Sequence, residues 1–109
     1  NLIKNSMEAI DDLAELGGLS ERPGIRIKCY VRKTFFTLEV IDNGIGIERR
    51  KLDAIFRAGY TTKESGTGLG LHSIANFVIG SGGKIRPLSG GIGKGATMRI
   101  ILPISTVSR

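Results

Sequence analysis

The sequence has a single cysteine, Cys29, among its 109 residues. One cysteine excludes an internal disulfide framework and any metal site built from several cysteines. No apolar run approaches the roughly 20 residues that a membrane-spanning helix needs, and the N-terminus lacks the basic lead and continuous apolar stretch of a signal peptide. The composition is that of one ordinary globular domain, with 40% apolar and 24% charged residues. The chain begins at Asn1 and not at Met, which is typical of a piece of a longer protein.

Acidic residues are nearly absent from the second half of the chain. Residues 56–109 carry seven basic side chains and one acidic one, Glu64, whereas residues 1–55 carry nine of each, so the whole net charge of +6 lies in the second half. Eleven of the 16 glycines lie there too. This combination suits a polyphosphate ligand, because glycine lets bare backbone N–H groups approach oxygens closely. A basic, loop-rich surface that binds nothing in particular, or nucleic acid weakly, explains the charge alone at least as simply.

Apolar spacing predicts the order of the elements. Helices are expected over 1–16, 48–56 and 68–80, a loop over 57–67, and strands over 25–32, 35–41, 84–88 and 96–102. The first two strands are expected to form an antiparallel hairpin that turns at Lys33-Thr34. Helices to one side of mostly antiparallel strands predict an α+β fold, a two-layer α/β sandwich.

The same patterns predict which side chains point inward. Strand 25–32 alternates and is expected to be half-buried, whereas strand 35–41 is apolar at most positions and is expected to be more central. The inward residues are predicted to be Ile25, Ile27, Cys29 and Val31 on the first strand, Leu52, Ile55 and Phe56 on the short helix, Leu71, Ile74, Ala75 and Val78 on the glycine-opened helix, and the phenylalanines Phe35, Phe36 and Phe77.

Four polar residues form a stripe on the first predicted helix: Asn1, Asn5, Glu8 and Asp12 follow the spacing i, i+4, i+7 and i+11. A solvated helix face is the simple explanation. Asparagine is a mediocre helix former, however, and Ala, Glu or Lys would serve a solvated face better than Asn5. An Asn carbonyl is a hard oxygen ligand that suits Mg²⁺.

Two glycine-rich segments follow. In residues 42–47, DNGIGI, Asp42 ends an apolar strand and can accept a hydrogen bond from a ligand donor such as an exocyclic amine, while an ordinary Asn-Gly turn is the alternative. Residues 66–71, GTGLGL, precede a helical pattern, and a glycine-rich loop before a helix N-terminus can bind anions. This segment matches neither the dinucleotide fingerprint nor a P-loop.

Taken together, these segments resemble the GHKL ATP-binding superfamily, and most closely the catalytic domain of two-component sensor histidine kinases. NLIKNSMEAI resembles the N box, DNGIGI the G1 box, IFRAGYTTK the F box and the start of the ATP lid, GTGLGLHSIANFV the G2 box, and GKGATMRIILP the closing motif. They occur in the family's order and cover nearly the whole chain. The resemblance implies a Bergerat-type domain over 1–104, with a mixed, mostly antiparallel sheet, a mobile lid over about 57–67 and a tail over 105–109.

The resemblance also implies roles for individual residues. Asn5 would ligate Mg²⁺, with Asn1 as a second polar group near metal or phosphate, and Asp42 would accept from the adenine amino group, partly through a water shared with Thr97. Gly44 and Gly46 would make room for the base, Ile47 would pack against it, and Phe56 would anchor the lid. The phosphates of ATP or ADP would meet the lid and the G2 box, at Thr61, Thr62, Lys63, Gly66, Thr67, Gly68, Leu69, Gly70 and Leu71.

Two departures from the superfamily bear on the reaction. The family domain normally begins with a strand and half a helix that would precede Asn1. In the ATP-hydrolysing members a glutamate general base stands at the position of Asn1, and an asparagine cannot take a proton from water. This favours a kinase over an ATP-hydrolysing clamp, while an anti-sigma-type serine kinase, which has the same fold, stays an alternative. Glu8 could be argued as a base instead, or is a polar group on the rim of the site.

The implied reaction transfers the γ-phosphoryl group to a histidine on a separate dimerisation domain. His72 is the only histidine of the chain, and it is expected near the helix start and not as the phosphoacceptor. The expected partners are that dimerisation domain, a response-regulator receiver domain and a second copy of the parent protein, in the cytoplasm or in the cytoplasmic part of a membrane-bound sensor. A nucleic-acid module, which would need basic residues interleaved with exposed aromatics, is disfavoured because the phenylalanines are expected inside.

Overall fold

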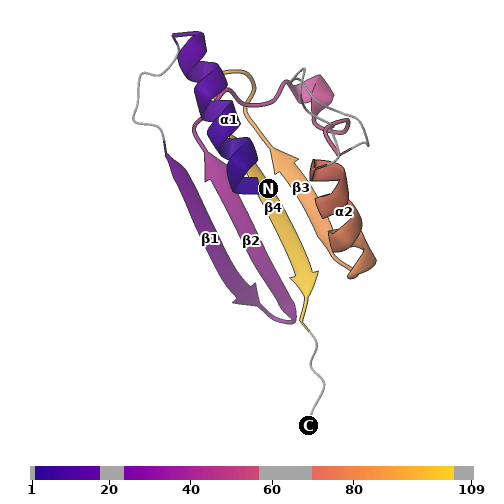
Figure 1. The fold of residues 1–109 in the computed structure, drawn as a ribbon. Helices are drawn as coiled ribbons and strands as arrows, with labels where there is room; N and C mark the ends of the chain where they lie inside the picture. Colours follow the sequence, from indigo (N-terminus) through magenta and orange to yellow (C-terminus); the bar gives the residue numbers. More distant parts are fainter. Residues whose placement is uncertain (1, 18–23, 57–69, 105–109) are drawn as a thin grey trace.

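The computed structural model describes residues 2–17, 24–56 and 70–104. Within these ranges the elements follow the predicted order (Figure 1). They are α1 (Leu2–Glu15), β1 (Ile25–Arg32), β2 (Phe35–Asp42), the 3-10 helix η1 (Arg49–Lys51), α2 (Gly70–Gly80), β3 (Lys84–Leu88) and β4 (Ala96–Pro103). The predicted loop over 57–67 and the tail over 105–109 lie outside the described residues.

The four strands form one sheet in the order β1-β2-β4-β3, and all three pairings are antiparallel. β1 and β2 are the predicted hairpin, with Arg32 opposite Phe35 and a turn at Lys33-Thr34. β2 and β4 take the two central positions, which confirms the prediction for residues 35–41. The sheet brings the end of β2 beside the start of β4, where Asp42 lies opposite Ala96.

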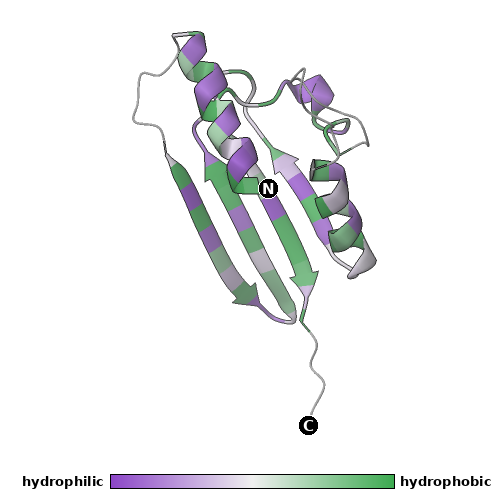
Figure 2. Cartoon of the chain, in the orientation of Figure 1, coloured by the Kyte–Doolittle hydropathy of each residue, from purple (hydrophilic) through white to green (hydrophobic). Residues whose placement is uncertain are grey.

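Both helices cover the same face of this sheet (Figure 1). Alternate residues of each strand point to this face, and the apolar stripes of the helices pack on them. Figure 2 shows the hydrophobic positions of β2 and β4 beneath the helices. The core cluster contains the buried residues Ala75, Val78, Ile85 and Ile100, with Leu2, Leu38, Phe56, Ile74 and Leu102 packed against it. Helices on one face, with no helix of the described ranges on the opposite face, confirm the α+β two-layer sandwich.

The prediction that β1 is half-buried is wrong. Ile27 is 51% exposed and Val31 is 62% exposed, and Cys29 is exposed as well. These side chains do point toward the helical face, but β1 is an edge strand and α1 lies mainly over β2. The prediction that the phenylalanines point inward is also wrong for two of them, because Phe35 is 45% exposed and Phe77 is 68% exposed.

The prediction of a helix over 48–56 is confirmed only in part. The structure has the three-residue helix η1 followed by turns through residue 56. The three residues of η1 are the basic Arg49, Arg50 and Lys51, so like charges crowd this single turn. Glu48 precedes them without capping the helix through its side chain. The predicted inward side chains are nonetheless in place, because Ile55 is buried and Leu52 and Phe56 are partly buried.

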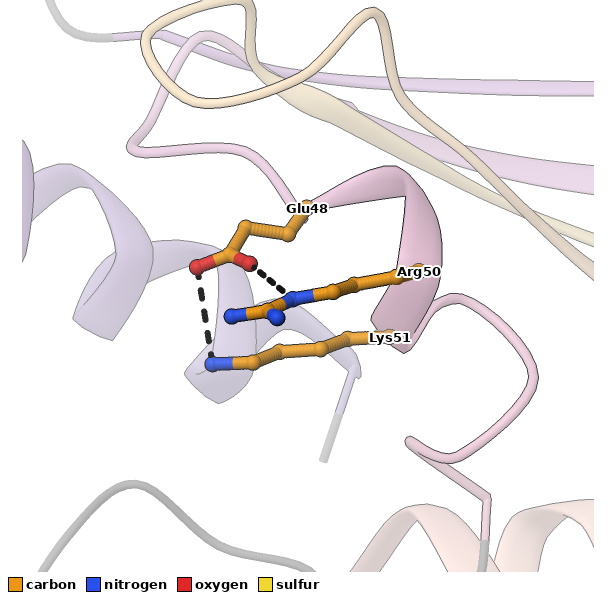
Figure 3. Close-up of polar contacts among 3 residues, drawn as sticks. All are labelled: Glu48, Arg50 and Lys51. Atoms are coloured by element: carbon orange, nitrogen blue, oxygen red, sulfur yellow. Dashed lines mark hydrogen bonds and ion pairs between the residues drawn. The ribbon is translucent and has the colours of Figure 1, made fainter.

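The Glu48 side chain binds the basic residues of this turn instead (Figure 3). Its carboxylate accepts a hydrogen bond from Arg50 Nε at 2.8 Å and lies 3.6 Å from Lys51 Nζ. The hydrogen bond from Arg50, and then the charge of Lys51, lower the pKa of the Glu48 carboxyl below its ordinary value. All three side chains are at the surface, so these contacts hold the turn together locally and add little to global stability.

Candidate functional site

Asp42 ends β2 on the helical face of the sheet, next to α1. Its Oδ2 accepts a hydrogen bond from Ser6 Oγ of α1 at 2.9 Å, and its Oδ1 accepts one from the backbone N–H of Gly44 at 2.9 Å. Ser6 is buried. These two bonds fix the plane of the carboxylate, while each carboxylate oxygen keeps capacity for a further donor. The strand end therefore presents an oriented acceptor, and its role toward a ligand donor stays a prediction.

The segment after Asp42 is held from two sides. On one side, Ile45 N donates to Ala9 O of α1 at 2.9 Å. On the other, the turn between β3 and β4 binds it through Gly93 N to Ile45 O at 2.6 Å and Gly95 N to Gly44 O at 3.1 Å. A third contact runs from Ile47 N to Ser89 Oγ at 3.0 Å. Residues 42–47 are thus a fixed loop between α1 and the turn, and not an ordinary hairpin turn.

Both glycines of this loop are needed for packing of the protein on itself. A Cβ at Gly44 would lie 2.6 Å from Ala9 C and 2.7 Å from Ile10 N, which are backbone atoms of α1. Gly46 has a φ of +83°, and a Cβ there would collide with the carbonyl oxygen of Gly91. The hypothesis that these glycines also make room for a base stays a prediction.

Gly44→Ala is therefore expected to lower the free energy of unfolding by about 1–3 kcal/mol, because the new methyl group must displace helix backbone. Urea denaturation of the variant measures this. Gly80→Ala is the matched control: a Cβ there meets nothing within 4 Å, so its stability should stay the same or rise slightly. Equal stability of Gly44→Ala and the parent chain would contradict the close packing of this loop on α1.

The polar stripe on α1 is not an ordinary solvated face. Asn5, Glu8 and Asp12 are partly buried, whereas the polar residues on the neighbouring faces, Lys4 and Asp11, are exposed. The Asn5 amide makes no hydrogen bond with the described part of the chain, so its carbonyl oxygen keeps its capacity to ligate a cation. Asn5 also directly precedes Ser6, the residue that binds Asp42. Asp42 is therefore bound by the turn of α1 that carries Asn5.

The structure describes only some of the other predicted site residues. Ile47 and Leu71 are partly buried, and Gly70 begins α2. Those that lie outside the described residues are Asn1, Thr61, Thr62, Lys63, Gly66, Thr67, Gly68 and Leu69.

The structure does not bring Thr97 to Asp42. Thr97 pairs with Ile41, while Ala96 stands opposite Asp42. Because successive strand residues point to opposite faces, the Thr97 side chain lies on the uncovered face of the sheet. The hydroxyl that meets Asp42 belongs to Ser6, which sequence reasoning missed. The sequence does contain a sign of this contact. Ser6 follows Leu2 by four residues, so it lies on the inward face of α1, and a buried hydroxyl there requires a hydrogen-bond partner.

His72 connects the start of α2 to the end of the turn that follows η1. Its Nδ1 lies 3.0 Å from the carbonyl oxygen of Phe56, and its Nε2 lies 3.2 Å from Asn76 Nδ2. Phe56 also packs against the core cluster. Phe56 and the start of α2 are thus tied to each other and to the core, while the role of Phe56 as an anchor of the lid stays a prediction.

An apolar hollow of about 340 Å³ lies elsewhere, between α2 and the sheet. Its lining residues are Phe36, Leu38, Ser73, Ile74, Phe77, Val78, Ile100 and Leu102. It offers almost no polar group, so it does not suit a charged nucleotide. Among residues 2–17, 24–56 and 70–104, no three His, Cys, Asp or Glu side chains gather as a metal site, and no helix is long and apolar enough to cross a membrane.

Curated relatives point in the same direction as this geometry. Sensor histidine kinase ZraS of Escherichia coli K12 is 36% identical over 105 residues, which cover 96% of this chain and 20% of the relative. Sensory histidine kinase/phosphatase NtrB of Rhizobium meliloti is 37% identical over 112 residues, covering 96% and 29%. The chain thus spans less than a third of either relative.

Solved structures share the fold. The nucleotide-free catalytic domain of histidine kinase ThkA superposes with a TM-score of 0.73 at 27% identity, over 94% of this chain and 60% of that one. Full-length ShkA in complex with AMPPNP has a TM-score of 0.78 at 21% identity, over 99% and 21%, which shows the shared fold alone. Residues 1–106, nearly the whole chain, match the model of one protein family. The chain belongs to the histidine kinase-, DNA gyrase B- and HSP90-like ATPase family.

Proposed function

We propose that this chain binds Mg-ATP and presents its γ-phosphoryl group to a histidine carried by another domain of the same protein. The observation that carries the proposal is the Asp42 carboxylate, oriented by Ser6 and by the Gly44 N–H beside the Asn5 stripe. An exocyclic amine that donates to this carboxylate places a purine against residues 42–47. The triphosphate then extends toward α1 and the N-terminus of α2, where backbone N–H groups favour anions.

Adenine selectivity follows from the same carboxylate. The amino group of adenine donates a hydrogen bond, and an ionised carboxylate only accepts. Guanine carries a carbonyl oxygen at the corresponding position, which would face the carboxylate oxygens without a proton between them. Equal competition by GTP in the parent chain would contradict the adenine assignment.

Asn5 is the residue that would hold Mg²⁺. Its donor is a neutral amide oxygen that no described residue engages, and such a donor fits a hard cation that keeps waters and phosphate oxygens as its other ligands. When bound, the ion neutralises phosphate charge and orients the phosphates. Asn5 supplies one fixed oxygen on a rigid helix, while Asp42 fixes the other end of the nucleotide.

The phosphoacceptor histidine lies outside this chain. Both ring nitrogens of His72 are already engaged, with Phe56 O and with Asn76, so neither is presented as a nucleophile. The named relatives are sensor histidine kinases, and at position 1 an asparagine stands where the hydrolysing members have a general base. We therefore favour phosphoryl transfer over an ATP-hydrolysing clamp. In this reaction the domain contributes positioning and charge neutralisation, with a dimeric parent protein and a receiver domain as further partners.

Incubation of the full-length protein with Mg-ATP labelled at the γ-phosphate tests the proposal. The expected product is a protein label that is stable in base and labile in acid, as a phosphoryl–nitrogen bond is, on a histidine outside residues 1–109. His72→Gln serves as the internal control and should retain the label. A label on serine, or rapid release of free phosphate without labelled protein, would show that the chain belongs to one of the alternative activities.

A further inference from the structure

The face of the sheet opposite the helices carries most of the charge of the described strands. Register and strand alternation place on it the cations Arg26, Lys28, Arg32, Lys84, Arg86 and Arg99. Glu39 is its one carboxylate. We call this surface the open basic face. The described part of the candidate nucleotide site lies elsewhere, because Asp42 and α1 are on the helical face.

The cations form two rows with a neutralised centre. Lys28, Glu39, Arg99 and Arg86 stand opposite one another across all four strands. In the middle of this line, Arg99 Nε donates to Glu39 Oε2 at 2.6 Å, and Glu39 is only 6% exposed. The remaining cations lie exposed on the two edge strands, β1 and β3. Three strand spacings, about 14 Å, separate these edges.

Two exposed aromatic side chains accompany the row on β1. Tyr30 is 43% exposed and stands between Lys28 and Arg32 along the strand, while Phe35 is 45% exposed and pairs with Arg32. Tyr30 and Phe35 are diagonal neighbours on adjacent strands, close enough to form one apolar patch. Arginine and aromatic residues are the types that protein–protein interfaces enrich and that contribute most to their affinity.

We propose that the open basic face docks an acidic surface of a partner protein. Carboxylates of the partner would meet the two edge rows, and an apolar group would cover Tyr30 and Phe35.

The exposed Tyr30 between Lys28 and Arg32 is also the pattern that suits a nucleic-acid strand. The affinity of such a strand depends on consecutive phosphates meeting cations. Here the cations stand in two rows separated by the neutralised Arg99–Glu39 pair, so a single strand suits the face less well. An anionic membrane attracts a protein according to the number of its cations. Binding to a membrane would therefore not explain the Arg99–Glu39 ion pair at the centre of the face.

The test uses a labelled peptide of about twenty glutamates as the acidic protein probe, with fluorescence anisotropy at about 0.15 M salt. The triple variant Arg26→Glu, Lys28→Glu and Arg32→Glu should bind it at least about tenfold more weakly than the parent chain. The matched control, Lys4→Glu with Arg49→Glu and Lys94→Glu, changes the net charge equally at exposed residues away from the open basic face. It should lose no more than about twofold. Backbone amide NMR shifts on adding the peptide should concentrate in β1 and β3.

Two further measurements keep the inference open to refutation. Lys84→Glu with Arg86→Glu repeats the test on the other edge strand, independently of the stability of the β1 variant. Tyr30→Ala leaves the charge intact, and it should weaken binding of a second peptide, in which every fourth glutamate is a leucine, more than binding of the all-glutamate peptide. Equal losses in the control variant, or amide shifts spread over the whole surface, would overturn the proposal. Tighter binding of a thymidine oligonucleotide, or of vesicles containing phosphatidylserine, through the same residues would overturn it in favour of those ligands.

Discussion

Asp42→Asn is expected to weaken ATP binding roughly ten- to hundredfold, because it removes a charge-assisted hydrogen bond and sets one amino group against another. The fold should lose about 1 kcal/mol or less, since an asparagine can still accept from Gly44 N and can donate to Ser6 Oγ. Calorimetric titration with ATP measures the first effect, and urea denaturation measures the second. A loss of stability as large as the loss of binding would mean that Asp42 acts only as a structural residue.

The same variant should also change base selectivity. The carboxamide can donate a hydrogen bond to the guanine oxygen, which the carboxylate cannot, so GTP should compete better relative to ATP than it does with the parent chain. Asp11→Asn is the matched control, because it removes one carboxylate at an exposed position of α1. It should leave both the affinity and the selectivity unchanged.

Asn5→Ala should remove most of the gain in ATP affinity that Mg²⁺ provides. The substitution deletes the one amide oxygen proposed to reach the ion, while alanine suits the helix better than asparagine does. The measurement compares ATP titrations with Mg²⁺ and with a chelator, for the variant and for the parent chain. The difference between the two conditions should shrink to near zero in the variant.

The binding of ATP without metal should change little in Asn5→Ala. The control is Lys4→Ala, at the adjacent exposed position of the same helix, which should preserve the full magnesium dependence. A variant that keeps the magnesium effect of the parent chain would rule out the metal role of Asn5, even if ATP binds.

Much of this fold could be predicted because its elements have clear periods. α1, β2, α2 and β3 were predicted to within about two residues, since their apolar spacing matches the covered faces. Burial on β1 could not be predicted from alternation. Alternation shows that Ile27 and Val31 share a face, and only the position of α1 over β2 shows that this face of the edge strand is left uncovered.

The same distinction between local pattern and packing applies to the candidate site. Asp42 and Asn5 could be chosen as candidates from residue type and position, because the sequence itself shows a carboxylate that ends an apolar strand and a polar stripe on a helix. Their roles toward a ligand stay predictions. Whether Ser6 or Thr97 lies next to Asp42 depends on how different elements pack against one another. Strand register turns the Thr97 side chain away from Asp42, and helix packing brings Ser6 to it, so neither could be predicted from local pattern.

A crystal structure of the chain with magnesium and AMPPNP tests the central claim most directly. The account predicts the adenine amino group within hydrogen-bonding distance of an Asp42 carboxylate oxygen, with Asn5 Oδ1 among the ligands of the metal. A base bound elsewhere, with Asp42 still bonded only to Ser6 and Gly44, would contradict it.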